Sequence, residues 1–357
     1  ASVINKNKMD LNRFKYTITK LEKYSFVDGK NSIEGKDVLG DFFEGIVSQG
    51  FKQSKGQFFT HKNIVNTLLY GLQLDDLAIS TVNNENRLPL MIDPSVGSGT
   101  FLIEYMKFIT NTLKRDQVEK LQTKRDVQDN LDSWFMPHNR ENRWAKDHLY
   151  GIENDFDLGS AAKVNMILHG DGSTNIFIKD GLSSFDNYVN ENKHNFLNFN
   201  EDGGEYKKNI NGKFDVVLSN PPFTIKLDEN TKEIIKKTFI FGEIDVSESL
   251  FIERYYQLLR ENGRLGVVLP ESIFDTPSQT YIRLFLLKYF KIKSIVSLPQ
   301  ISFKPYTDTK TSLLFAQKKT ASELNDWNEH WNVSSKNWSK LVTRVQNLLD
   351  VYVLGKD

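Results

Sequence analysis

Short apolar runs, separated by segments with helical spacing, follow one another along the chain from about residue 88 onward. The seven runs are LPLMID (88–93), HLYGIE (148–153), NIFIKD (175–180), FDVVLS (214–219), RLGVVLP (264–270), KSIVSLP (293–299) and TSLLFAQ (311–317). Runs of this length, bounded by turn residues and linked by helices, are typical of strands that are buried on both faces of a parallel sheet. We therefore predict an α/β fold, with a mostly parallel sheet of seven strands and helices on both of its faces.

The connection between the last two runs differs from the others. It is the loop QISFKPYTDTKT (300–311), which is too short to hold a crossover helix. Because parallel neighbours need a long crossover, we expect these two strands to pair antiparallel. The prediction is a sheet in which only the last strand is reversed.

The hydrophobic pattern divides the chain into three parts. Residues 1–54 have helical spacing and predict a small helical N-terminal region, and residues 55–320 hold the sheet. Residues 321–357 form a tail with a plausible amphipathic helix from Trp338 to Val351. We expect this helix to dock on the sheet domain or on a partner.

Three segments within the domain carry no strand signal. NIVNTLLYGLQL (63–74) predicts a helix, and residues 114–147 predict a charged, mostly helical insert. Residues 183–213 are rich in Asn and weakly periodic, which predicts a long surface insertion between the third and fourth strands.

Composition removes several classes of function. The chain has 357 residues and no cysteine, which excludes disulfides, thiolate metal sites and cysteine nucleophiles. Its six histidines are scattered without metal-ligand spacing, so we expect no metal site. No window is apolar enough for a membrane span, and the first residues lack a signal-peptide core, so we expect a cytoplasmic protein.

Net charge limits how the chain could bind nucleic acid. It carries 46 basic and 46 acidic residues, so its formal net charge is zero. Proteins that bind nucleic acid alone are more often basic overall. A role on nucleic acid would therefore depend on a local patch or on a partner.

A glycine-containing turn, DPSVGSGTF (93–101), follows the first strand. Gly97 and Gly99 would let a ligand approach the backbone, although a tight strand-to-helix turn needs glycines in any case. The turn does not match GxGxxG, because residue 102 is Leu. The leading acid, Asp93, disfavours a pyrophosphate and suits a ligand with a cationic or donor group.

Polar side chains end four of the predicted strands. Asp93, Glu153, Asp180 and Asn220 follow the first to the fourth strand, so they should line one rim of the sheet. Glu153 could accept hydrogen bonds from ribose hydroxyls, and Asp180 one from an adenine amino group. Asp171 competes with Asp180 for that role but precedes its strand. Single acids at such places are also common helix caps.

The fourth strand ends in SNPPF (219–223), where two prolines cannot continue the ladder. One interpretation is a stiff turn with a ring packed into the core. The other is a site that holds a flat ring bearing an amino group. The residues of this segment alone leave both open.

Seven motifs in this order resemble those of the amino-methylating DNA methyltransferases that use S-adenosylmethionine, above all the modification subunit of type I restriction systems. They are KGQFFT (55–60), DPSVGSGTF (93–101), GIE (151–153), KDGL (179–182), NPPF (220–223), GRLGVVLPES (263–272) and TKTSLLF (309–315). NPPF alone is moderately specific, whereas its combination with GQFFT and DPxxGSGxF is highly specific. The resemblance implies a Rossmann-like, S-adenosylmethionine-dependent methyltransferase fold.

The resemblance also assigns roles residue by residue. The implied cofactor-binding residues are Gly56, Phe58, Thr60, Asp93, Pro94, Gly97, Ser98, Gly99, Phe101, Glu153 and Asp180. The implied target-base residues are Asn220, Pro221, Pro222 and Phe223. Thr60 would meet the methionine carboxylate, Glu153 the ribose and Asp180 the adenine. One residue departs from the family pattern, because His61 stands where a proline is usual.

The activity implied by the resemblance is methyl transfer to the N-6 amino group of adenine in duplex DNA, with the base flipped out of the helix. Asn220 and Pro221 would accept the amino hydrogens through their oxygens, and Phe223 would stack on the base. Methylation at cytosine carbon is excluded, because it needs a cysteine. Amino groups of cytosine, of guanine in ribosomal RNA and of protein glutamine remain alternatives, as does a catalytically silent assembly subunit.

The expected partners are inferred from the size of the C-terminal tail. The tail, 321–357, is too short for a target-recognition domain of ordinary size. We therefore expect a separate specificity subunit, with a restriction subunit as a further candidate partner. The N-terminal helices and the C-terminal helix are the expected docking surfaces.

Overall fold

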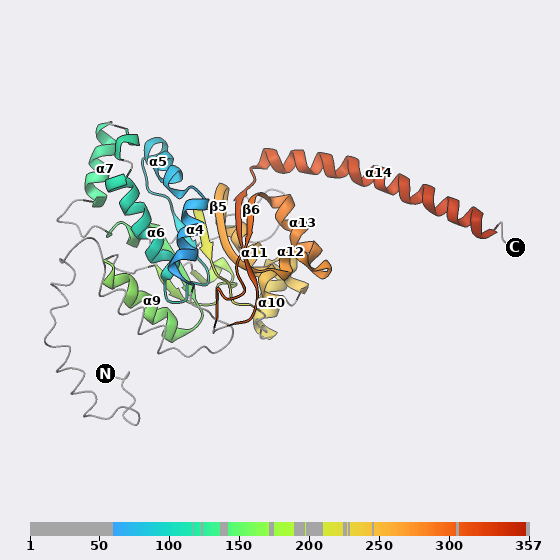
Figure 1. Cartoon of the computed structure of the whole chain (residues 1–357), viewed down its shortest axis with the longest axis horizontal. Helices are drawn as coiled ribbons and strands as arrows, with labels where there is room; N and C mark the ends of the chain where they lie inside the picture. Colours follow the sequence, from blue (N-terminus) through green and yellow to red (C-terminus); the bar gives the residue numbers. More distant parts are fainter. Residues whose placement is uncertain are drawn as a thin grey trace, which may run out of the picture.

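The computed structural model describes residues 60–116, 118–122, 124–135, 142–170, 175–188, 197, 210–223, 227, 229–244, 246–304 and 307–354. Within these residues, seven strands form one sheet in the order β3-β2-β1-β4-β5-β7-β6 (Figure 1). The strands are β1 (Met91–Asp93), β2 (Leu149–Glu153), β3 (Ile176–Ile178), β4 (Phe214–Ser219), β5 (Leu259–Pro270), β6 (Phe290–Ser297) and β7 (Thr311–Lys318).

The direction of the strands confirms the predicted sheet. The strands from β3 to β5 pair parallel, whereas β7 pairs antiparallel with both of its neighbours, β5 and β6. Only the last strand is therefore reversed, as expected. The sequence did not show that β7 lies between β5 and β6, which makes β6 the edge strand.

Helices cover both faces of the sheet. They are α4 (Lys62–Gly71), α5 (Leu74–Glu85), α6 (Thr100–Asn111), α7 (Arg125–Phe135), α8 (Ala145–His148), α9 (Phe156–Leu168), α10 (Glu229–Thr238), α11 (Ser247–Leu258), α12 (Ser272–Asp275), α13 (Thr280–Tyr289) and α14 (Ala321–Leu354). Figure 1 shows α4 and α6 on one side of the sheet and α11 to α13 on the other. The predicted helix at 63–74 corresponds to α4, and the predicted insert contains α7 and α8.

The buried apolar residues form two hydrophobic cores, one on each face of the sheet, because side chains along a strand alternate between the faces. In β4, Val216 and Leu218 pack with α4, α5, α6 and α9, whereas Val217 packs with α10, α11 and α13. Successive side chains of a strand point to opposite faces, so a strand covered on both sides must be apolar throughout. This is why the strands appeared in the sequence as continuous apolar runs.

The order of the strands reverses direction between β1 and β4, in the middle of the sheet. β1 and β4 are parallel neighbours, but the chain leads from β1 to β2 on one side and from β4 to β5 on the other. In such sheets ligands bind at this switch point, beyond the carboxyl ends of the strands. Asp93 ends β1 and Ser219 ends β4, so the DPSVGSGTF and NPPF segments both leave the sheet there.

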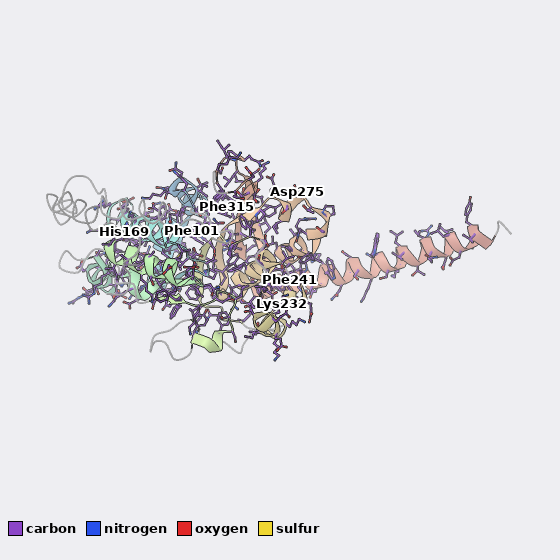
Figure 2. The ribbon with its side chains drawn as sticks, turned by 90° about the horizontal axis from the view of Figure 1, so that it is seen from below. Phe101, His169, Lys232, Phe241, Asp275 and Phe315 are labelled. Carbon is purple, nitrogen blue, oxygen red and sulfur yellow. The ribbon has the colours of Figure 1, made fainter. Side chains whose placement is uncertain are left out.

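The C-terminal helix is longer than predicted. α14 has 34 residues, whereas the pattern indicated only residues 338–351. It extends away from the body of the molecule, and its side chains point into solvent (Figures 1 and 2), unlike the labelled Phe101 and Phe315. Near its start, Glu323 pairs with Lys291 of β6 at 2.9 Å, and every described residue from Glu329 onward is exposed. Docking on the sheet domain is therefore limited to the first turns.

Several predictions fall on residues outside those that the structure describes. They concern the N-terminal helical region, the motif residues Gly56 and Phe58, the competing acid Asp171 and most of the 183–213 insertion. Among the helices that are described, none has the length and apolar character needed to span a bilayer.

Candidate active site

Asp93 joins the ends of β1 and β4. Its side chain is fully buried, and its Oδ1 accepts hydrogen bonds from the Ser219 hydroxyl at 2.7 Å and from the Ser95 backbone N–H at 3.0 Å. The hydroxyls of Ser95 and Ser219 lie 2.8 Å apart. These bonds hold the turn after β1 against the turn after β4.

The second oxygen of Asp93, Oδ2, is buried and has no hydrogen-bond partner among the described residues. Burial raises the pKa of Asp93 to about 7, although the bonds from Ser219 and Ser95 oppose that rise. A buried acceptor without a donor costs free energy. This oxygen is therefore suited to hold a proton or a donor group of a ligand.

The glycine turn connects β1 to the end of β2. Gly97 has a positive φ of 55°, and apart from its chain neighbours no heavy atom of the described residues lies within 4 Å of the position that a β-carbon would occupy there. Its N–H donates to Glu153 Oε2 at 2.9 Å, and Glu153 Oε1 accepts from the Asp155 N–H at 3.0 Å. Burial raises the pKa of Glu153. The turn is open toward solvent beside a fixed carboxylate.

The turn after β3 lies against the turn after β1. A β-carbon on Gly181 would come within 2.1 Å of the Pro94 carbonyl oxygen, so the two backbones touch. Asp180 is half-buried, and its Oδ1 accepts from the Leu182 N–H at 2.9 Å. Asp180 therefore lies at the same rim as Asp93 and Glu153.

Asn220 is held from two directions. Its Nδ2 donates to Thr60 Oγ1 at 3.1 Å, and its backbone carbonyl accepts from the Ser95 hydroxyl at 3.3 Å. Its Oδ1 is buried and has no hydrogen-bond partner among the described residues. The amide therefore presents a free acceptor at the carboxyl end of β4.

The other predicted site residues differ in how open they are. Pro222 is half-buried, whereas Pro221 is buried and Phe223 is only 8% exposed. Phe223 belongs to the core on the α4 side. Phe101 lies in the same core at 4% exposure. The Ser98 carbonyl accepts from Asn165 of α9 at 3.0 Å, which fixes the turn before α6.

His61, the departure from the family pattern, caps α4. Its Nδ1 accepts from the Asn63 N–H at 3.2 Å, and its backbone φ is −64°. A proline fixes φ near that value. The histidine thus keeps the backbone angle that a proline would impose on the residue after Thr60 and adds a side-chain cap.

Three site residues were missed by the sequence analysis. Ser95 and Ser219 stand inside the quoted motifs, but only the pairing of β1 with β4 shows that their hydroxyls meet. Arg254 of α11 is 1% exposed and donates from Nη2 to the carbonyls of Leu182 and Ser183 at 2.9 and 2.8 Å. In the sequence it stands beside Glu253 in SESLFIERYYQL (247–258), where nothing distinguishes it from the other polar residues.

Arg254 anchors the turn that carries Asp180. Its guanidinium carbon lies 4.4 Å from the ring centroid of Phe185 and 4.7 Å from that of Phe239. Stacking on two rings and two carbonyl bonds hold the planar group in one orientation. The backbone after β3 is therefore fixed from inside the protein.

Two curated proteins are similar to this chain in sequence. The chain is 25% identical over 276 residues to the type II restriction enzyme and methyltransferase RM.BcgI of Heyndrickxia coagulans, covering 76% of this chain and 32% of that protein. It is 24% identical over 340 residues to the EcoEI methylase subunit, of the type I restriction enzyme from Escherichia coli, covering 90% and 54%. The chain thus spans about a third to about a half of the length of these relatives.

A solved structure supports the fold. A Listeria monocytogenes chain assigned to the class I S-adenosylmethionine-dependent methyltransferases superposes with a TM-score of 0.52 at 18% identity, covering 87% of this chain and 73% of that one. The fold is accordingly that of the S-adenosylmethionine-dependent methyltransferases. The family described as N-6 DNA Methylase matches residues 34–350, nearly the whole sequence. The chain belongs to the N-6 DNA methylase family, and its relatives are DNA methyltransferases of restriction-modification systems.

Proposed function

We propose that this chain transfers a methyl group from S-adenosylmethionine to the N-6 amino group of adenine in duplex DNA. The observation that carries the proposal is the amide of Asn220. Its Nδ2 is engaged by Thr60, whereas its Oδ1 is a buried acceptor without a partner among the described residues. An acceptor of this kind at a switch point fits an amino group that enters from outside.

The residues at the rim fit the cofactor. Asp93 Oδ2 is a buried acceptor without a partner in the described part of the chain, which suits the cationic end of a methionine moiety. Gly97 leaves open space beside it. Glu153 would bind the ribose hydroxyls, Asp180 the adenine amino group and Thr60 the carboxylate. Pro94, Ser98, Gly99 and Phe101 shape the turn that holds these groups.

When bound, the cofactor supplies an electrophilic sulfonium methyl group. An adenine amino group is a poor nucleophile, because its lone pair is delocalised into the ring. Asn220 Oδ1 and the Pro221 carbonyl would each accept one amino hydrogen, which favours a tetrahedral nitrogen with a free lone pair. Their contribution is orientation and electrostatic stabilisation, without a covalent intermediate.

The base would have to leave the duplex to reach the Asn220 amide, since its amino group is paired inside the helix. Phe223 would support the extruded base from the side of the core, and Pro222 stiffens the turn between them. The amide at residue 220 favours adenine over cytosine, for which the related sites usually carry serine.

We further propose that the chain acts as the modification subunit of a restriction-modification system and obtains its sequence specificity from a separate subunit. The formal net charge is zero, so the chain lacks the basic balance of an independent DNA-binding protein. One relative is itself named a methylase subunit. α14 offers an exposed surface for such a partner.

The test uses the complex that is purified from source cells through a tag on this chain. Binding of S-adenosylmethionine is measured by calorimetry, and transfer of tritiated methyl groups is measured on unmethylated duplex DNA, on RNA and on protein. We expect incorporation into DNA alone, recovered as N6-methyladenine. Incorporation only into RNA or protein would contradict the proposed substrate.

Asn220→Ala tests the role of the amide. We expect transfer to fall at least roughly a hundredfold, the usual effect of removing one preorganised polar group, while cofactor affinity and the unfolding midpoint change little. Asn63→Ala, at an exposed asparagine of α4, is the matched control and should behave like the wild type. Unchanged transfer in Asn220→Ala would refute the assignment.

A further inference from the structure

We propose that Thr60 is a positioning residue, which sets the orientation of the Asn220 amide so that its oxygen, and not its NH₂ group, faces the target amino group. This inference rests on the proposed function, because it concerns the same amide. Thr60 and Asn220 are 160 residues apart in the sequence and meet only in the folded chain, at 3.1 Å from Nδ2 to Oγ1.

The two orientations of an asparagine amide have nearly the same shape. A half-turn about the last side-chain bond exchanges oxygen and NH₂, so packing alone does not select between them. Hydrogen bonds make the selection. In the reversed orientation the NH₂ donors of Asn220 would point at the donors of the incoming amino group, and neither could bond to the other.

In the productive orientation the Thr60 hydroxyl accepts one N–H of Asn220, whereas in the reversed orientation it would have to donate to the amide oxygen. The hydroxyl therefore selects the productive orientation when another acceptor takes its proton. Without that acceptor, the productive orientation would leave an N–H of the partly buried amide unpaired, which costs free energy. Because the hydroxyl accepts at Asn220, its own proton remains available to another acceptor. An anionic ligand group that takes this proton would commit the hydroxyl to accepting from Nδ2.

The hydroxyl is held by a packed element. Thr60 is 7% exposed and directly precedes His61, the N-cap of α4. In α4, Val65, Leu68 and Leu69 are fully buried against the sheet. The helix therefore ties the backbone that follows Thr60 to the core beside β4.

The first experiment compares Thr60→Val, which keeps the shape and removes the hydroxyl, with Thr60→Ser, which keeps the hydroxyl. In the purified complex we expect kcat for methyl transfer to fall about 10- to 100-fold in Thr60→Val, which is the scale of a lost positioning contact. Cofactor Kd should change by a smaller factor than kcat. Thr60→Ser should stay within about threefold of wild type. Thr67→Val, at an exposed threonine of the neighbouring helix α4, is the matched control.

The second experiment observes the amide itself. Side-chain NH₂ signals are recorded by NMR on protein that carries isotope-labelled asparagine. The Asn220 signals are assigned by their loss in Asn220→Ala. We expect the Asn220 NH₂ protons to exchange with water faster in Thr60→Val than in wild type. Added S-adenosylhomocysteine, which carries the same carboxylate, should slow this exchange in wild type and not in Thr60→Val.

Two outcomes would overturn the inference. One is a Thr60→Val enzyme with wild-type kcat, or one that loses cofactor affinity alone. The other is an Asn220 NH₂ exchange rate that does not depend on the residue at position 60. A wild-type complex that methylates no DNA would instead refute the proposed function, and the exchange experiment would still report on the Thr60–Asn220 contact.

Discussion

Asp93 is a buried carboxyl whose charge should make stability depend on pH. Burial raises its pKa from 3.8 to about 7 in the folded chain, so folding takes up a proton between these values. The unfolded chain ionises first as pH rises. The folded state is therefore progressively destabilised from about pH 4 to 7, and the loss is complete above the folded pKa.

Asp93→Asn removes this titration and mimics the protonated carboxyl. We expect the free energy of unfolding of the variant, relative to wild type, to rise with pH between about 4 and 7, by at most about 1.4 kcal/mol per pH unit, and to level off above pH 7. Urea unfolding at several pH values measures the difference. Asn63→Ala, which removes no titratable group, should show no such trend. A difference that shrinks as pH rises would contradict the expected protonation.

At the residue scale, the sequence located the acids and the amide because each follows an apolar run. The carboxyl ends of parallel strands lie at one rim of the sheet whatever the order of the strands, so Asp93, Glu153 and Asn220 could be placed there in advance. The hydroxyl contacts could not be predicted. Ser95 meets Ser219 across 124 residues only because β1 is the neighbour of β4.

At the scale of elements, α11 carries Arg254 beneath the turn after β3. Arg254→Lys keeps the charge but loses the planar fork that serves two carbonyls and stacks on two rings. We expect faster hydrogen exchange in residues 180–185, where the Ser183 N–H donates to the Asp180 carbonyl at 2.9 Å. Exchange mass spectrometry of peptides from this segment measures the effect, and we expect weaker cofactor binding with it.

Arg283→Lys is a close control for that experiment. Arg283 of α13 also donates from one nitrogen to two backbone carbonyls, of Ile273 and Thr276, at 2.9 Å each. Its substitution should loosen the α12 segment and leave residues 180–185 unchanged. Equal exchange of 180–185 in wild type and Arg254→Lys would show that other contacts fix the turn.

Most of the strands were predicted from apolar runs that are buried, whereas β6 was found from its apolar run although its residues 293–297 are exposed. All seven strands were found, yet β5 begins at Leu259 and not at residue 264. The missed part, LRENG (259–263), includes exposed polar positions, so it lacks an apolar run. The position of β7 between β5 and β6 could not be deduced. The same apolar pattern fits a last strand that pairs antiparallel with β6 at the edge of the sheet and one that lies between β5 and β6.

At the scale of the whole molecule, α14 is the part whose apolar surface the described chain does not cover. Leu324, Trp331, Trp338, Val345 and Tyr352 recur every seven residues, with Trp327, Leu341 and Leu348 between them. Trp338 is 66% exposed and Leu341 50% exposed. Such a repeat along one face is typical of a helix that packs against other helices.

Under the proposed function, this face of α14 docks the specificity subunit, so charges placed on it should break the complex without unfolding the chain. We expect Trp338→Glu with Leu341→Glu to bind S-adenosylmethionine like wild type, to lose co-purification with the specificity subunit and to lose site-specific DNA methylation together with it. Size-exclusion chromatography and pull-down through a tag on the chain measure assembly. Thr343→Glu with Asn347→Glu adds the same charge on the opposite face and should leave the complex intact. If the Trp338→Glu, Leu341→Glu variant still assembles and methylates DNA, the partner binds elsewhere, and this face of α14 has no part in docking it.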